Sequence, residues 1–330
     1  MESYLKLIIF ILTIQSFSAC NTVESKTGKI TGEVEASNDK SDGRAPLLVS
    51  KDFGKTWESA TDNLPTEIQV SFLEPIGNEI VLASDNMGIF LSTKNKINWS
   101  SIGDKLPSRK INALHVSADK IYAGVYRQGI YQTTDEGKIW KSLNYNLQNL
   151  KVQSIFNLDE QLFVGTDEGL FTLLDGTEKW EATGVRAQVL SIYAYDNKLV
   201  VGTSQGTLMS QDKGGSWEWL RKQGAIHYTR NIGSRIIELA LNGDLVHSDD
   251  WGKTWTNTSY GPRKGSYVYE IIEIGDYQLM SNNYGIHRSD DNGEEWEHIF
   301  ATESIAFFDL IAIGDRVYGG TRAWDEYRKR

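Results

Sequence analysis

Short apolar segments alternate with polar turns along most of the chain, and residues 152–183 show the pattern completely. VQSIFNL is followed by a turn at DE, then by QLFVGT, a turn at DEG, LFTLL, a further turn, and KWEAT. Apolar and polar residues tend to alternate within these segments, as in strands that bury one face. The pattern predicts four short antiparallel strands joined by tight turns.

The same pattern recurs at a nearly constant period. It returns in KIYAGVYRQGIYQTTDEG, KLVVGTSQGTLMSQDKG and YQLMSNNYGIHRSDDNG. Each repeat has a tryptophan at the start of its last strand, and these are Trp57, Trp99, Trp140, Trp180, Trp217, Trp255 and Trp296. Their spacings are 42, 41, 40, 37, 38 and 41 residues. A period of about 40 residues in a strand-rich chain is typical of a β-propeller, in which each repeat forms one four-stranded blade.

The two ends of the repeat region complement each other. Six complete repeats run from about residue 66 to residue 300. Residues 47–60 provide the two outer strands of a further blade, and residues 307–321 provide the two inner strands. Pairing these halves would close the ring without leaving a long sheet edge unpaired. We therefore predict an all-β domain over residues 45–330: a seven-bladed β-propeller with four antiparallel strands per blade, one of them a composite blade.

The turn before the last strand has its own signature. It reads SKDFGKTW, TTDEGKIW, SQDKGGSW, SDDWGKTW and SDDNGEEW, with weaker copies STKNKINW and LLDGTEKW. Its aspartates are Asp52, Asp135, Asp175, Asp212, Asp250 and Asp291. Asp can accept hydrogen bonds from turn amides, Gly can adopt a positive φ, and Trp can pack back across the blade. We interpret these residues as structural rather than catalytic or metal-binding.

The pattern S-x-D-x-G-x-T-W resembles the Asp box, or BNR repeat. This repeat occurs in sialidases, sortilin-type Vps10 receptors, GH74-type xyloglucanases and the Ycf48/HCF136 photosystem assembly factors. The resemblance implies a propeller fold and leaves the function open. With one propeller and an arginine-rich face, the chain is most similar to the Ycf48 group, which implies a binding or assembly role. The alternative is a carbohydrate-active enzyme, either sialidase-like or another glycoside hydrolase.

Residues 1–19 read as a signal peptide. The apolar run LIIFILTI follows Lys6 and is too short to remain as a membrane-spanning helix. Small residues then precede Cys20, and this arrangement resembles the lipobox of bacterial lipoproteins, which implies cleavage before Cys20 and lipidation of its thiol. Residues 20–44 are poor in large apolar side chains, so we expect a flexible tether behind the lipidated cysteine. An ordinary signal peptide with an incidental cysteine is the alternative.

These features predict a lipoprotein of the bacterial cell envelope, on the outer membrane or the cell surface. The net charge of −10 argues against nucleic acid as a partner. Cys20 is the only cysteine, so no internal disulfide is possible, and no metal-binding motif is present. We expect a monomer that needs no cofactor.

Ligand binding is expected on one particular face. In a propeller, the loops between blades and the turns between second and third strands surround one mouth of the channel; we call this the loop face. It gathers basic and aromatic candidates for contact with a protein or glycan: Arg109, Arg127, Arg186, Arg263, Arg322, Tyr126, Tyr228, Tyr267, Tyr284 and Trp324. The alternative is that these are merely solvated loop residues.

No catalytic residue can be singled out. Glycoside hydrolysis needs two carboxylates facing each other across the substrate. The carboxylates expected on the loop face are Asp62, Glu67, Asp85, Asp104, Asp167, Glu168, Glu303, Asp325 and Glu326, and their spacing favours no pair. Among the five histidines, only His227 is expected in a loop of this face.

Overall fold

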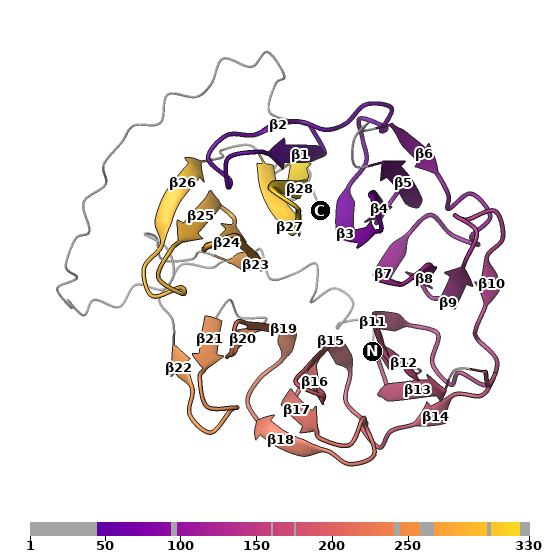
Figure 1. The fold of residues 1–330 in the computed structure, drawn as a ribbon. Coiled ribbons are helices and arrows are strands. Elements are labelled where there is room, and N and C mark those ends of the chain that lie inside the picture. The colour runs from indigo at the N-terminus through magenta and orange to yellow at the C-terminus, as the bar shows by residue number, and fades with distance from the viewer. Residues whose placement is uncertain are drawn as a thin grey trace, which may run out of the picture.

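Seven four-stranded antiparallel sheets stand around a central axis like the blades of a propeller (Figure 1). The computed structural model describes residues 45–93, 98–159, 161–174, 176–240, 245–257, 267–301 and 305–323. No helix occurs within these ranges. The predicted fold class and blade number are confirmed.

Each blade runs outward from an inner strand that faces the axis. Blades one to three are β3 (Val70–Ile76), β4 (Glu79–Ser84), β5 (Ile89–Thr93) and β6 (Trp99–Ser101); β7 (Ile111–Ser117), β8 (Lys120–Val125), β9 (Gly129–Thr133) and β10 (Lys141–Ser142); and β11 (Val152–Leu158), β12 (Gln161–Thr166), β13 (Leu170–Leu174) and β14 (Glu181–Ala182). Blades four to six are β15 (Val189–Tyr195), β16 (Lys198–Thr203), β17 (Gly206–Ser210) and β18 (Glu218–Arg221); β19 (Ile226–Ile232), β20 (Arg235–Ala240), β21 (Leu245–Ser248) and β22 (Thr256–Asn257); and β23 (Val268–Ile274), β24 (Tyr277–Asn282), β25 (Gly285–Ser289) and β26 (Glu297–Ala301).

Blade seven is the composite blade. Its order is β2-β1-β28-β27, with β1 (Leu47–Ser50) and β2 (Glu58–Ser59) from the first repeat and β27 (Ile305–Ile313) and β28 (Arg316–Ala323) from the last. The closing ladder pairs Leu47 with Gly320 and Ser50 with Val317. The ring therefore closes through hydrogen bonds between segments from opposite ends of the domain.

Apolar side chains fill the spaces between blades. One buried cluster joins Val81 and Ile89 of blade one to Ile111, Leu114 and Ile121 of blade two, and similar clusters follow around the ring. The two-residue alternation of each strand explains this arrangement, because it gives each blade two faces that both pack on a neighbour.

The Asp boxes are compact hydrogen-bonded turns. In blade five, Ser248 Oγ donates to Asp250 Oδ1 at 2.9 Å and accepts from the Gly252 amide at 2.8 Å. The Thr254 amide and hydroxyl both donate to the Asp250 carboxylate, at 2.8 and 2.6 Å. Gly252 has a φ of 80° and approaches Leu220 of the preceding blade, so a side chain there would be strained in both respects. Equivalent Ser or Thr contacts surround Asp52, Asp135, Asp212 and Asp291, whereas Asp175 lies outside the described residues.

The indole groups at the ends of these turns bond in two ways. The Nε1 atoms of Trp57, Trp255 and Trp296 donate to the Gly carbonyl of their own turn. In contrast, those of Trp99, Trp140 and Trp180 donate to carbonyls of the preceding blade, at Ala60, Ile102 and Leu143. Trp99 and Trp180 belong to the two weakest motifs and are the deepest, at 5% and 3% exposure. All three of these tryptophans thereby join adjacent blades, including Trp140, whose turn keeps the Asp and Gly of the motif.

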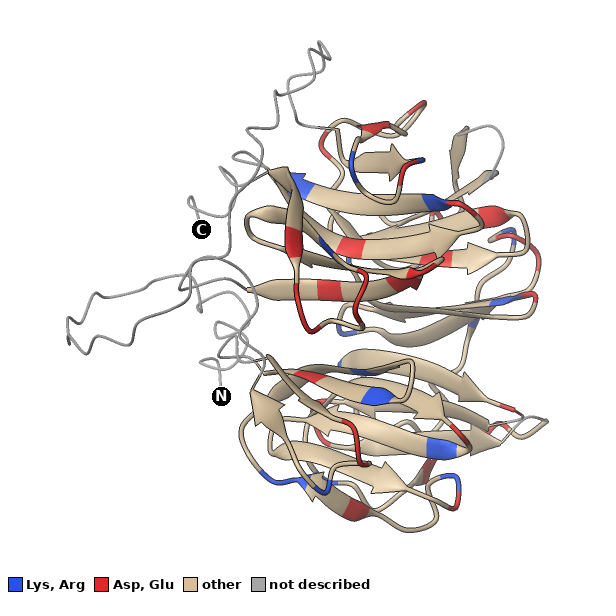
Figure 2. Ribbon diagram, turned by 60° about the vertical axis from the view of Figure 1, so that its left-hand side comes forward, with Lys and Arg blue, Asp and Glu red and all other residues tan. Residues whose placement is uncertain are grey.

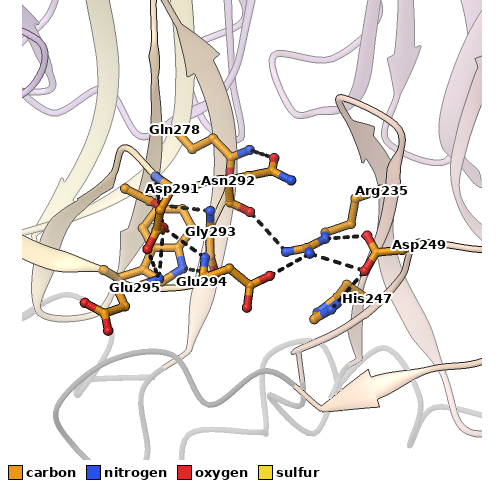
Figure 3. Close-up of polar contacts among 11 residues, drawn as sticks. Arg235, His247, Asp249, Gln278, Asp291, Asn292, Gly293, Glu294 and Glu295 are labelled. Atoms are coloured by element: carbon orange, nitrogen blue, oxygen red, sulfur yellow. Dashed lines mark hydrogen bonds and ion pairs between the residues drawn. The ribbon is translucent and has the colours of Figure 1, made fainter.

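An arginine also links two blades on the Asp-box side. Arg235 of β20 is 7% exposed and donates to Asp249 Oδ1 at 2.8 Å within blade five. Its other nitrogens reach blade six, where they donate to Glu294 Oε1 at 2.8 Å and to the Asn292 carbonyl at 3.0 Å. Figure 3 shows the guanidinium lying between these partners. All its contacts are within the fold, which gives it a structural role.

Candidate functional site

Three of the candidate residues lie in two neighbouring loops on the loop face of blade two. Arg109 and Arg127 are exposed, and the Tyr126 ring lies close to two cationic side chains. The Lys110 ammonium is 4.8 Å from the Tyr126 ring centroid, and the Arg127 guanidinium carbon is 5.2 Å from it. The Tyr126 amide donates to the Lys110 carbonyl at 2.9 Å, which holds the two loops together. We call Arg109, Lys110, Tyr126 and Arg127 the blade-two rim.

Exposed apolar surface continues beside this rim. Tyr145 is 71% exposed and Leu150 is 39% exposed, both in the loop that connects blades two and three. The Leu150 carbonyl accepts a 3.0 Å hydrogen bond from the Gly129 amide, so this loop is attached to the rim. Lys151 follows, with Nζ 3.0 Å from Asp167 Oδ2.

The remaining candidates lie elsewhere. Arg186 is exposed between blades three and four, whereas Tyr267 and Tyr284 belong to two adjoining turns of blade six that Asn283 joins. Arg322 is part of β28 rather than of a loop; its Nε donates to the Val70 carbonyl at 2.8 Å, and its guanidinium lies 4.6 Å from the Phe308 ring centroid. Arg263 and Trp324 lie outside the described residues.

Two residues assigned to a loop by sequence lie on a strand. β19 begins at Ile226, which pairs with Ala240, so His227 and Tyr228 are part of an inner strand. The expected loop extended too far because the first residues of an inner strand carry polar side chains at the channel mouth. Tyr228 turns its hydroxyl into the channel wall and donates to Glu270.

The inner strands enclose a channel of about 770 Å³, to which all seven blades contribute. Every inner strand has a β-bulge near the loop face, at its second residue in β3, β7, β11, β15, β19 and β23 and at its fourth residue in β27. Tyr269 and Phe308 occupy this position in blades six and seven, line the channel, and stack with ring centroids 4.5 Å apart. A bulge redirects the side chains that follow it, and in blades five, six and seven the next residue is ionisable: Tyr228, Glu270 and Asp309.

A charged cluster occupies the channel wall over four consecutive blades. Glu270 Oε1 accepts from Tyr228, from Arg230 Nη1 at 2.9 Å and from its neighbouring amide at 3.1 Å. In the next blade, Asp309 Oδ2 accepts from the Leu73 amide at 2.7 Å. Glu74 completes the group, which we call the channel cluster: Glu74, Tyr228, Arg230, Glu270 and Asp309. Figure 2 shows acidic positions on the strands as well as in the turns.

Comparison with known proteins agrees with this architecture. Residues 47–60 match the family described as BNR-Asp box repeat. Among curated proteins none matches the chain. The chain is a seven-bladed β-propeller, and the BNR-Asp box match covers the first of its Asp-box turns.

Solved structures of low sequence identity share the fold. YCF48 bound to D1 peptide is 14% identical with a TM-score of 0.64, and the match covers 84% of this chain and 93% of that one. The extracellular domain of the one-component system BT4673 from B. thetaiotaomicron is also 14% identical with a TM-score of 0.64, over 74% of this chain and 36% of that one. A GH74 xyloglucanase from Xanthomonas campestris is 13% identical with a TM-score of 0.56, over 76% of this chain and 46% of that one. The Asp-box propeller thus spans less than half of the last two chains, and these likenesses show the fold alone.

Burial controls the ionisation of the channel cluster. Burial raises the pKa of Glu74 to about 7, although Arg230 opposes the shift. Burial likewise raises the pKa of Glu270 and of Asp309, and for Asp309 the neighbouring Glu270 adds to it. The pKa of Arg230 is raised by the charges of Tyr228 and Glu270. Its side chain keeps 45% exposure although it lies deep in the ring, so its accessible part faces the channel.

Sequence reasoning missed the three acids of the channel cluster. They stand on inner strands, and only loop carboxylates were considered. The repeats held a signal, because the positions matching Glu270 and Asp309 in blades two, three and four are Ala113, Ser154 and Ser191. In blades one and five the matching residues are Phe72 and Tyr228, so an acid at this position marks a departure from the other repeats.

Within the ranges the structure describes, no three His, Cys, Asp or Glu side chains are placed to hold a metal ion. The same ranges contain no helix long and apolar enough to cross a membrane. The described candidates form a basic and aromatic rim on blade two and a channel whose wall carries Glu74, Glu270 and Asp309.

Proposed function

We propose that this Asp-box propeller is a binding module that holds an acidic segment of another protein against its loop face. The observation that carries the proposal is the blade-two rim. It concentrates Arg109, Lys110 and Arg127 in a chain whose net charge is −10, beside a tyrosine that is 71% exposed. Cationic and aromatic side chains of this kind are enriched where proteins bind each other.

The likeness to YCF48 supports a polypeptide ligand over a glycan. That propeller has a TM-score of 0.64 to this chain and is described as bound to a peptide. The rim cations would attract an acidic segment, and the exposed Tyr145 and Leu150 would cover its apolar side chains. We further propose that lipidated Cys20 anchors the module to the cell envelope.

Peptide binding tests the proposal. Two fluorescein-labelled decapeptides, one of alternating Glu and Ala and one of alternating Lys and Ala, are titrated with the protein and followed by anisotropy. We expect the acidic peptide to bind more tightly. Arg109→Gln combined with Arg127→Gln should weaken it at least about tenfold, or about 1.4 kcal/mol.

The matched control is Lys138→Gln with Lys141→Gln. It removes the same charge from exposed residues of the same blade, in the Asp-box turn and the last strand. This control should bind the acidic peptide like the wild type. Equal losses in both double variants, or stronger binding of the basic peptide, would contradict a loop-face site for an acidic segment.

The second candidate is a glycoside hydrolase that uses the channel cluster. The observation in its favour is Glu74, because a carboxyl group with a pKa of about 7 can act as a general acid near neutral pH. Release of reducing sugar from xyloglucan, abolished in Glu74→Gln with the fold retained, would favour this candidate. We place it second because Glu270 and Asp309 already accept hydrogen bonds from the protein.

A further inference from the structure

One interface between blades departs from the repeat. The inner two strands of blade five pair Thr229 with Glu238. The matching pairs in the other blades are all uncharged and free of polar side-chain atoms: Leu73–Leu82, Leu114–Ala123, Ile155–Val164, Ile192–Val201, Ile271–Met280 and Leu310–Gly319. The repeats thus show that the fold itself does not require polar residues here.

The facing blade departs from the repeat at the same place. Thr207 of β17 belongs to blade four. The matching residues elsewhere are Leu47, Ile89, Ile130, Leu170, Leu245 and Ile286. Each of these apolar residues is at most 5% exposed. Polar residues have therefore replaced apolar ones on both sides of the contact between blades four and five.

These side chains are buried with hydrogen-bonding capacity unused. Glu238 and Thr207 are fully buried, Thr229 is 3% exposed and Tyr193 is 8% exposed. Arg221 Nη1 donates to Glu238 Oε2 at 3.0 Å. Four other atoms have no hydrogen-bond partner: Glu238 Oε1, Thr207 Oγ1, Thr229 Oγ1 and Tyr193 OH.

The four atoms belong to one neighbourhood. Thr207 is close enough to act on the Glu238 carboxylate, and Thr229 on the Tyr193 hydroxyl, although neither pair has hydrogen-bond geometry. Leaving such groups buried and unpaired costs free energy, and native proteins avoid it. A bound molecule that both donates and accepts hydrogen bonds would satisfy these groups together.

We propose that the wall between blades four and five is a binding site for ordered water, held by Tyr193, Thr207, Thr229 and Glu238. The site favours an uncharged molecule, because the Arg221 guanidinium already balances the charge of the Glu238 carboxylate. Three hydroxyls and one carboxylate oxygen supply the two to four partners that a buried water needs. Tyr193 and Thr229 also line the channel, which provides a route of entry.

A consequence is that blades four and five are joined by a hydrated polar seam rather than by an apolar core. The seam leads from the channel wall to Arg221, whose guanidinium lies 5.6 Å from the Trp255 ring centroid and whose side chain is 15% exposed. This site is independent of the ligand proposed for the loop face.

A crystal structure at a resolution that shows buried waters elsewhere in the ring tests the site directly. We expect at least one ordered water within hydrogen-bond distance of two or more of the four residues. An empty seam, or one in which the side chains bond each other, overturns the proposal.

Thr→Val variants supply a second readout because they remove a hydroxyl with little change of shape. In a hydrated seam, Thr207→Val and Thr229→Val each deprive the water of a partner, so Tm should fall by about 2–4 °C. Thr203→Val is the matched control, since that buried hydroxyl of the same blade donates to the Gly206 carbonyl at 2.7 Å and its loss should lower Tm. If Tm rises in both seam variants while the control falls, the hydroxyls are unpaired and the water site is refuted.

Discussion

Acids in the turns and acids in the channel respond to pH in opposite directions. Hydrogen bonds from Thr254 lower the pKa of Asp250 to about 2, so the ionised form stabilises the fold. That contribution is complete above the ordinary pKa of 3.8 and is lost as the pH falls through about 2. Burial raises the pKa of Glu74 to about 7, so its contribution is complete below 4.5 and is lost as the pH rises through 7. Stability should therefore be greatest in mildly acidic solution.

Glu74→Gln should remove part of this pH dependence. The amide stays neutral at all pH values, so the variant should be more stable than the wild type by about 2–3 kcal/mol at pH 8 and nearly equal to it at pH 4. Urea unfolding at both pH values measures the difference. Glu79→Gln, on the other strand of the same hairpin beside its turn, is the control. A stability difference that is the same at both pH values would show that Glu74 does not titrate as described.

At the scale of strands and turns, most blades repeat the same turn and all repeat the bulge, and one ladder differs from the others in how the chain connects its strands. The Asp box fixes the turn into the last strand, and a β-bulge near the loop face redirects each inner strand. The ladder between β1 and β28 is the exception in connectivity, since it joins strands from opposite ends of the domain. Closure therefore depends on a pairing with high sequence separation, which forms only after much loop-closure entropy has been lost.

Removing the last two strands should open the ring. A chain that ends at residue 304 lacks β27 and β28, so it exposes the edge of β1 and the packed faces of the neighbouring blades. We expect aggregation or a broad, non-cooperative unfolding transition, measured by circular dichroism and light scattering. A chain that starts at residue 45 keeps every described strand and should unfold cooperatively. Identical melting curves for the two chains would refute closure by the composite blade.

At the scale of the whole molecule, the propeller and the proposed lipid anchor are separate parts of the chain with separate roles. The described propeller needs no membrane to bury its apolar surface, since its apolar clusters lie between blades. Residues 21–44 would have a root-mean-square reach of roughly 25–30 Å as a flexible coil. The loop face could then bind a partner at some distance from the lipid.

Cys20→Ser tests the anchor. The thiol is the acceptor for the acyl chain, so wild-type protein should sediment with membranes and resist a high-salt wash, because its attachment is hydrophobic. The serine variant should remain uncleaved or be released as a soluble propeller. Fractionation with immunodetection distinguishes these results. If salt releases the wild type, or if a cleaved serine variant stays with the membrane, the lipoprotein interpretation is wrong.

The sequence by itself determined the strands, the number of blades and the way the ring closes. These depend on local signals: the two-residue alternation, the turn residues, the 37- to 42-residue spacing of tryptophans, and half a repeat at each end. Each signal lies within one repeat or within a terminal half-repeat, so the fold could be predicted without knowing which distant residues are in contact.

The tertiary structure alone decided which residues share the channel. Glu74, Glu270 and Asp309 come together because blades one, six and seven are neighbours in a closed ring, and a repeat pattern does not say which strand edge faces the axis. The bulges shift the alternation at the mouth, which is why Tyr228 was expected in a loop but points from β19 to Glu270. The seam at Thr207 and Glu238 likewise exists only where two blades meet, since each residue alone is simply a polar side chain in a strand. Contacts between repeats depend on three-dimensional packing, and so the residues of the channel cluster and of the seam were not contained in the period that revealed the fold.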